Sequence, residues 1–235
     1  MMLGWDFASH TNWGNSMLSV RRVRDLARFF YNQRVVGFSV PDEPWFDDES
    51  SSNFRTLMAR AKSYVEYGAG GSTVLADRTD MPTITVEGDR FFAQAVKKKI
   101  REQGSVELLV ANIGTTVEWG APMFKNLTPK RKALWLSYVD APYKALREKN
   151  RPLPDLVLVD GRMRRACALE SVRQAQAGNQ AITVCFDDYT PREHYKSVED
   201  WLGEPQIVGR MAIFQSQAAK PVPREVVLEA ARDWR

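Results

Sequence analysis

The chain has 235 residues, a formal net charge of +4 and a hydrophobic content of 44%. This composition is typical of one globular domain with appendages, and no apolar run approaches the roughly 20 residues that span a bilayer. The first residues lack the basic-then-apolar order of a secretion signal, so we expect a cytoplasmic protein without a membrane span. Cys167 and Cys185 have no CxxC spacing and are expected to fill the core.

Residues 1–62 are expected to form an N-terminal helical cap and linker. Residues 19–32 place their apolar side chains on one side of a helix. Residues 41–49 are acidic and contain two prolines, which is typical of a turn-rich linker. A further helix is predicted for residues 53–62, and it leads into the first strand.

From residue 63 onward, predicted strands and helices alternate. Strands are predicted at 63–67, 83–87, 106–112, 155–160 and 181–186, and helices from residue 72, at 89–103 and at 164–177. Residues 206–215 indicate an antiparallel pair that turns near Gly209–Arg210, and residues 223–234 indicate a last helix. The order predicts an α/β fold with a doubly wound, mostly parallel seven-stranded sheet and an antiparallel terminal hairpin.

We assign residues 63–218 to the core and residues 219–235 to a C-terminal helix. The connection 114–154 is unusually long and is expected to be an inserted segment on the substrate side. It contains a helix start at Thr128–Pro129. Its aromatic side chains either line an acceptor pocket or form a small satellite core: Trp119, Phe124, Trp135 and Tyr143.

The most informative stretch is Ser63–Thr73, where a short strand breaks into a glycine turn and then opens a helix. Glycines let backbone N–H groups approach a ligand closely, and the following helix N-terminus favours negative charge. The next strand ends on Glu87, whose two oxygens suit the vicinal hydroxyls of a ribose. Together these features predict a nucleoside ligand at the carboxyl edge of the sheet.

This pattern resembles the class I S-adenosylmethionine-dependent methyltransferases, over about Ser63 to Gln215. The resemblance lies in the Glu66–Gly71 loop, in Glu87, in the stretches 155–161 and 186–189 and in the terminal hairpin. It implies a Rossmann-like methyltransferase fold with S-adenosylmethionine as the cofactor. The cofactor-binding residues that it implies are Glu66, Gly68, Gly70, Gly71, Ser72, Glu87 and Asn112.

Several of these residues have a second interpretation. Ser72 is expected to cap the helix or to donate to the carboxylate of the ligand, and the two roles are compatible. Glu66 either bonds the backbone of its own loop or reaches the ammonium of the ligand. Asn112 either accepts from the adenine amino group or is a turn residue before Gly114. Asp89 is predicted to cap the helix that follows it.

Within this class, Asp160, Asp187 and Asp188 are similar to the carboxylates of metal-assisted O-methyltransferases of the catechol and macrolide-sugar types. The resemblance implies that these three hold Mg²⁺, which would orient a substrate hydroxyl. The macrolide-sugar type usually reads Asp-Gly-Asp-His, whereas this chain continues Asp160-Gly161-Arg162-Met163-Arg164. An arginine beside a divalent cation is unfavourable unless it faces an anionic substrate. Uncharacterised bacterial methyltransferase-like proteins share the Val-Asp-Gly-Arg stretch.

The expected catalytic residues are Asp160, Asp187 and His194, where His194 is either a general base or an ordinary surface histidine. The resemblance implies transfer of a methyl group to a hydroxyl of a small molecule or glycan. One alternative is a nucleic-acid methyltransferase, disfavoured because no Asn-Pro-Pro-Tyr-type motif follows residue 160. A second is an inactive methyltransferase-like interaction module, and Thr73 argues against a third, an NAD-linked oxidoreductase. The acceptor and the use of a metal stay open, and a homo-oligomer is compatible with the sequence.

Overall fold

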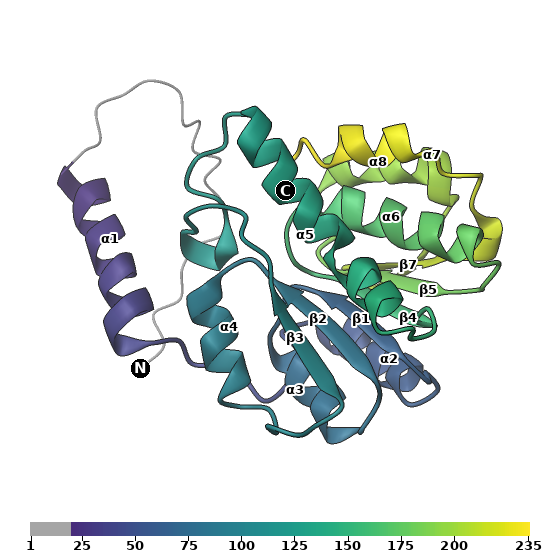
Figure 1. Cartoon of the computed structure of the whole chain (residues 1–235), viewed down its shortest axis with the longest axis horizontal. Helices are drawn as coiled ribbons and strands as arrows, with labels where there is room; N and C mark the ends of the chain where they lie inside the picture. Colours follow the sequence, from purple (N-terminus) through teal and green to yellow (C-terminus); the bar gives the residue numbers. More distant parts are fainter. Residues whose placement is uncertain (1–19) are drawn as a thin grey trace.

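A seven-stranded sheet organises the structure, a computed structural model that describes residues 20–235 (Figure 1). The strands run in the order β3-β2-β1-β4-β5-β7-β6, and only β7 lies antiparallel to its neighbours β5 and β6. Their bounds are β1 Tyr64–Tyr67, β2 Thr83–Glu87, β3 Val106–Val110, β4 Leu156–Val159, β5 Thr183–Phe186, β6 Gln206–Val208 and β7 Met211–Gln215. The predicted doubly wound sheet with its terminal hairpin is confirmed.

Helices cover both faces of this sheet (Figure 1). One face carries α5, α6 and α8, and the other carries α2, α3 and α4. The α-helices of the described residues are α1 Val20–Tyr31, α2 Asp48–Met58, α3 Gly71–Arg78, α4 Arg90–Lys97, α5 Pro129–Glu148, α6 Arg164–Ala177, α7 Glu199–Leu202 and α8 Arg224–Ala230. Short helical turns lie at η1 Asn32–Val36, η2 Glu118–Gly120, η3 Glu193–Val198 and η4 Ser216–Ala218.

The central strands β1 and β4 are buried on both faces, as their apolar sequences predict. Because side chains alternate along a strand, Val65 and Tyr67 pack under α5 and α6, while Tyr64 faces α2. Glu66 follows the Tyr64 face and is therefore a carboxylate in the buried layer beneath α3. This placement decides the role of Glu66 in the site.

Several predicted helix bounds are wrong, including the end of α2, which lies at Met58 instead of residue 62. Helix α2 begins at Asp48 instead of residue 53, because the Asp47 carboxylate accepts the backbone N–H of Ser50 (3.0 Å) and caps it. Helix α4 ends at Lys97 instead of residue 103, and α8 ends at Ala230 instead of 234. The predicted cap of α4 is confirmed, since Asp89 Oδ1 accepts from the backbone N–H of Phe91 (2.8 Å).

The two α-helices of the N-terminal segment lie at different places relative to the sheet. Helix α1 stands apart from the sheet layers in Figure 1, whereas Phe54 and Met58 of α2 pack against the sheet. The part of the predicted cap that falls on residues 1–19 lies outside the described residues. Among residues 20–235, no helix is both long and apolar enough to cross a membrane.

The aromatic residues predicted in the segment 114–154 fall into two groups, one buried and one exposed. Trp135 and Tyr143 are fully buried on α5, and Trp135 donates to the carbonyl of Ile113 (3.1 Å). Trp119 and Phe124 are exposed in the loop ahead of α5. Helix α5 therefore contributes Trp135 and Tyr143 to the hydrophobic core, whereas the loop 114–128 exposes Trp119 and Phe124.

Candidate active site

The glycine loop joins β1 to α3 and touches the loop that follows β4. Gly68 has a φ of +95°, and a Cβ there would lie 2.7 Å from the Cα of Gly161. Both the backbone conformation and the close approach of the two loops require glycine at residue 68. The carboxyl ends of the two central strands are thereby held against each other.

Gly70 and Gly71 differ in what surrounds them. A Cβ at Gly70 would meet no atom of residues 20–235 within 4 Å, so this residue borders space that the described chain leaves open. A Cβ at Gly71 would collide with the backbone carbonyl of Glu43. The segment 42–47, which we call the strap, therefore crosses directly over the start of α3.

Glu66 is enclosed by hydroxyl groups beneath the loop. Its carboxylate accepts hydrogen bonds from Ser72, from Thr73 (2.6 Å) and from Thr85 (2.8 Å), and Tyr64 lies at 3.3 Å. Burial raises the pKa of Glu66, and these hydroxyl donors oppose that shift. Glu66 therefore binds the loop region through the side-chain hydroxyls of Ser72 and Thr73.

Ser72 does not cap α3. The helix begins at Gly71, and Gly70 occupies the cap position with its N–H donated to Thr73 Oγ1 (2.9 Å). The Ser72 hydroxyl points instead at Glu66. Glu66 and Ser72 therefore bond to each other beneath the loop, and a ligand role for either residue stays a prediction.

Glu87 lies directly beside the glycine loop. Its Oε2 accepts the backbone N–H of Ala69 (3.1 Å), and its Oε1 accepts the N–H of Asp89 (2.7 Å). Each carboxylate oxygen keeps a further lone pair for another donor. Burial raises the pKa of Glu87 to about 7, while the two N–H groups act in the opposite sense.

Asn112 is held in a turn. Its Oδ1 accepts the backbone N–H of Gly114 (2.9 Å), and its side chain is exposed. This is the turn role that the sequence offered as one of two alternatives. A second acceptor lone pair on the same oxygen stays open to solvent.

Asp160, Asp187 and Asp188 come together at the ends of β4 and β5, with carboxylate oxygens within 4.8 Å of one another. Three arginines neutralise them. Arg164 lies 2.9 Å from Asp160, Arg192 lies 2.7 Å from Asp188, and Arg210 binds Asp187 through Nε and Nη2, both at 3.1 Å. We call these six residues the acid–arginine cluster.

The donor set of this cluster does not fit a divalent cation. Every carboxylate already accepts an arginine, and Arg210 also lies 3.3 Å from Asp188. Buried Arg164 donates to the carbonyls of Asp160 (2.9 Å) and Asp187 (2.8 Å). A metal would have to displace guanidinium groups that also hold the backbone, so the predicted grouping is confirmed while the Mg²⁺ role finds no support in the geometry.

Two carboxyl groups of the acid–arginine cluster nevertheless have raised pKa values. Burial raises the pKa of Asp160 to about 7, with Arg164 opposing and the neighbouring carboxylates adding to the shift. Burial also raises the pKa of Asp187, and the hydrogen bonds from Arg210 oppose it. Asp160 keeps 34% of its side chain exposed, so it is accessible to a ligand.

His194 lies in a different neighbourhood. Its ring packs on Tyr195 with centroids 4.3 Å apart, and burial together with Arg235 lowers its pKa. The charges that act on it are those of Arg165, Arg192, Asp233 and Arg235. No described contact joins its ring to Asp160 or Asp187, so the structure does not bring the third predicted catalytic residue to the other two.

Two loops meet over the site. Trp45 of the strap and Trp119 of the 114–128 loop pack against each other in a tilted arrangement, with ring centroids 5.5 Å apart. Arg210 donates to the Trp45 carbonyl, and Arg162 donates to the Trp119 carbonyl. A Cβ on the adjacent Gly120 would lie 3.8 Å from Glu87 Oε1, so this loop borders the site.

The sequence analysis did not name the arginines of the cluster as partners of its acids. Arg164 stood out only as a departure from the metal-binding motif, and Arg210 only as part of the terminal turn. The spacing of Asp187 and Arg210 in the sequence carries no signal of pairing, because they meet only where Asp187 follows β5 and Arg210 precedes the antiparallel neighbour β7. One signal was present in the sequence: Arg164 begins the helix that follows an apolar strand, which suggests that its side chain is buried.

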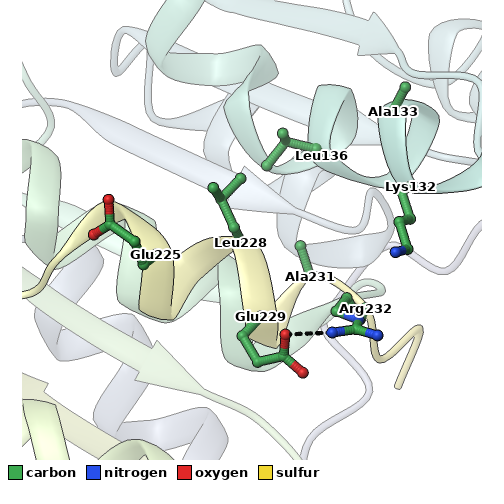
Figure 2. A pocket seen from close by; sticks show the side chains of 8 residues that line it. All are labelled: Lys132, Ala133, Leu136, Glu225, Leu228, Glu229, Ala231 and Arg232. Carbon is green, nitrogen blue, oxygen red and sulfur yellow. Dashed lines mark hydrogen bonds and ion pairs between the residues drawn. The ribbon is translucent and has the colours of Figure 1, made fainter. Parts of the chain in front are cut away.

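A groove of about 440 Å³ lies elsewhere, between α5 and α8. In Figure 2, Leu136 and Leu228 point toward each other across it, and Lys132, Glu229 and Arg232 lie along its sides. Glu229 and Arg232 pair with each other at 2.6 Å. None of the predicted site residues lines this groove, so it is separate from the candidate active site.

The strand order, the antiparallel β7 and the glycine loop beside an acid at the end of β2 define a Rossmann-like methyltransferase fold of class I. The chain is similar to a methyltransferase-like protein from Silicibacter pomeroyi, with 30% identity, a TM-score of 0.65 and coverage of 83% of this chain and 100% of that one. It belongs to this family of methyltransferase-like proteins.

A second solved structure resembles the chain more distantly. It is the N-methyltransferase NodS from Bradyrhizobium japonicum in complex with S-adenosyl-L-homocysteine, with 11% identity, a TM-score of 0.40 and coverage of 81% of this chain and 97% of that one. No family model matches the chain, and no curated protein does.

Proposed function

We propose that the protein transfers a methyl group from S-adenosylmethionine to a hydroxyl of a small molecule or glycan. The observation that carries this proposal is the hydrogen bond between the Ala69 N–H and Glu87 Oε2 (3.1 Å). It places the glycine loop and the acid after β2 side by side at the carboxyl edge, where doubly wound sheets bind ligands.

The donor would bind across this contact. The open space at Gly70 would receive the methionine portion near the start of α3, and Glu87 would accept the ribose hydroxyls with its remaining lone pairs. Glu66 would keep the loop in shape through Ser72 and Thr73. The free lone pair of Asn112 would be available to the adenine amino group.

Asp160 is the residue that we assign to the acceptor. It lies at the end of β4, beside the contact between Gly161 and Gly68, and it stays partly exposed. With a pKa raised to about 7, its carboxylate is suited to take the proton of a hydroxyl whose oxygen attacks the methyl group in line. Asp187, held by Arg210, would act as a positioning residue for the cluster.

The direct test is isothermal titration with S-adenosylmethionine. Gly70→Arg fills space in which a side chain meets no neighbour, so it should block the donor without disturbing the fold. Gln103→Arg is the matched control, because it adds the same exposed charge ahead of β3, at the opposite edge of the sheet. We expect binding by wild type and control and none by Gly70→Arg.

Turnover is tested separately with a donor carrying a labelled methyl group and fractionated small-molecule and glycan pools, with and without EDTA. Label in a fraction that depends on Asp160 would support the assigned reaction. Donor binding without transfer to any pool would favour an inactive interaction module instead. The absence of any heat of binding in the wild type would sink the proposal.

A further inference from the structure

A group of cations surrounds Trp234 beside the acid–arginine cluster. Lys125 Nζ lies 4.1 Å from the centroid of the Trp234 ring, and Arg162 Cζ lies 5.8 Å from it. Arg235 follows Trp234 in the chain. We call Lys125, Arg162, Trp234 and Arg235 the Trp234 cation cluster, and it joins three segments that are distant in sequence.

The positive charges of this cluster act on one another. Burial lowers the pKa of Lys125, and Arg162 and Arg235 lower it further. Burial also lowers the pKa of Arg162, with Arg164 contributing in the same sense. Like charges in a partly dehydrated place repel one another, and a nearby anion lowers that cost.

The nearby carboxylates are already committed. Asp233 lies 2.8 Å from Arg235 and 3.1 Å from Arg165. Asp160, two residues before Arg162, lies 2.9 Å from Arg164. Among the described residues Arg162 has no ion pair, although its neighbours Arg164 and Arg165 both have one.

Arg162 also has an unused donor. Its Nη2 donates to the carbonyl of Trp119, while its Nε is buried and finds no acceptor among residues 20–235. A buried N–H without a partner is costly, so such groups call for an explanation. A guanidinium that has one donor engaged still presents a planar edge that suits the paired oxygens of a carboxylate or phosphate.

Arg162 lies in the loop after β4, whereas the methyl donor is expected at the glycine loop after β1. It follows Asp160 at the end of β4, and its guanidinium is attached to the loop that carries Trp119 and Lys125. The carboxylate of the methyl donor is expected at the glycine loop, after β1. An oxyanion at Arg162 would therefore belong to the second substrate.

We propose that the methyl acceptor carries an oxyanion, either a carboxylate or a phosphate, that Arg162 binds. This inference rests on the proposed function and narrows its substrate to an anionic hydroxy compound. Trp234 holds the cations in place through its ring. The hydroxyl of the acceptor would then lie toward Asp160.

The site is tested first with inorganic phosphate as the probe, in the full chain, at ionic strength balanced with sodium chloride. The arginine Nε–H resonances of ¹⁵N-labelled protein report the contact, and the Arg162 signal is the one missing in Arg162→Lys. We expect this signal to shift saturably. Arg162→Gln should weaken phosphate binding about tenfold or more, and Arg162→Lys less, because it keeps the charge.

Lys132→Gln is the matched control, since Lys132 is an exposed cation on α5. It should change the phosphate affinity less than about twofold. Equal weakening by the control and by Arg162→Gln, or no saturable shift in the wild type, would overturn the oxyanion site. Thermal melts of each variant verify that a loss of binding is not a loss of fold.

The identity of the acceptor is tested with the labelled methyl donor and a metabolite extract separated on an anion exchanger. We expect label in the retained fraction, and Arg162→Lys should raise KM for that fraction about tenfold with kcat little changed. Labelled product in the unretained fraction would overturn the inference. If calorimetry showed no donor binding, the proposed function would fall and the acceptor assignment with it, while saturable phosphate binding would still establish the oxyanion site.

Discussion

Trp45 and Trp119 pack against each other beside the candidate active site with their ring centroids 5.5 Å apart, and each backbone carbonyl accepts from an arginine. The two side chains are 73% and 69% exposed, so the pair stabilises the fold little. The pair instead links the strap, which crosses the start of α3, to the 114–128 loop, which borders Glu87. Donor entry and release would require this link to open.

Trp45→Ala should loosen the link. An aromatic pair contributes about 1 kcal/mol, so we expect donor dissociation to become a few-fold faster, with the free energy of unfolding changed by less than about 1 kcal/mol. Stopped-flow fluorescence measures the rate. Trp45→Phe, which keeps a ring against Trp119, is the control, and an unchanged rate in Trp45→Ala would contradict a gating role.

Gly68→Ala and Gly70→Ala should differ sharply. The first places a Cβ against Gly161 at a φ of +95°, and we expect a loss of about 2–4 kcal/mol in the free energy of unfolding. The second adds a methyl group where no atom lies within 4 Å, so its stability should stay close to that of the wild type. Chemical denaturation gives both values. Equal losses would show that the loop packs differently from the structure.

Glu87 should make stability fall as the pH rises toward neutrality. Its pKa in the folded chain is about 7, above the ordinary value of 4.5, so between these values the folded state binds more protons than the unfolded state. Relative to Glu87→Gln, the wild type should lose up to about 3 kcal/mol of stability between about pH 5 and about pH 8. Denaturation at several pH values measures this difference, with the exposed Glu102→Gln as the control.

The ionisation of Glu87 should also affect binding of the methyl donor, and here its pH dependence is opposite to that of the stability. An ionised Glu87 is the better acceptor for ribose hydroxyls, so donor affinity in the wild type should rise as the pH passes 7. Glu87→Gln should bind the donor more weakly and lose that dependence on pH. Calorimetry across this range decides the point, and a pH dependence retained in the variant would assign it to another group.

Arg210→Met should leave the buried carboxylate of Asp187 without its two guanidinium hydrogen bonds. We expect a loss of about 3 kcal/mol in the free energy of unfolding. The double variant with Asp187→Asn should recover part of it, because the uncompensated charge is gone. Arg192→Met is the milder control, since Asp188 keeps Arg164 and Arg210 as neighbours.

Added Mg²⁺ should not raise the Tm of the wild type, because the three carboxylates of the acid–arginine cluster are already neutralised. In Arg210→Met the freed oxygens of Asp187 and Asp188 should accept the ion, so that Mg²⁺ raises the Tm. Calorimetric scans with Mg²⁺ and with EDTA measure both cases. Stabilisation of the wild type by Mg²⁺, reversed by EDTA, would restore the metal site that the sequence resemblance implied.

The elements of the core could be predicted because their signals are local. Residues 83–87 and 164–177 were predicted with the observed bounds, since an apolar run and a helical periodicity are visible within a few residues. Helix α2 was predicted to begin too late because acidic and proline residues before it suggested a linker. The capping signal was Asp47 with Ser50, three residues on, and it competed with that turn signal.

The sequence by itself determined the order of strands and helices, the glycine turn and the acid at the end of β2. Each of these depends on neighbours in the chain or on one repeating pattern. The tertiary structure decided that Glu66 binds hydroxyls beneath its loop and that arginines neutralise the three aspartates. It also decided that a buried donor of Arg162 finds no partner within residues 20–235. The partners come from strands and loops far apart in sequence, and a charge or hydrogen bond acts through space. Only the folded chain shows which of them meet.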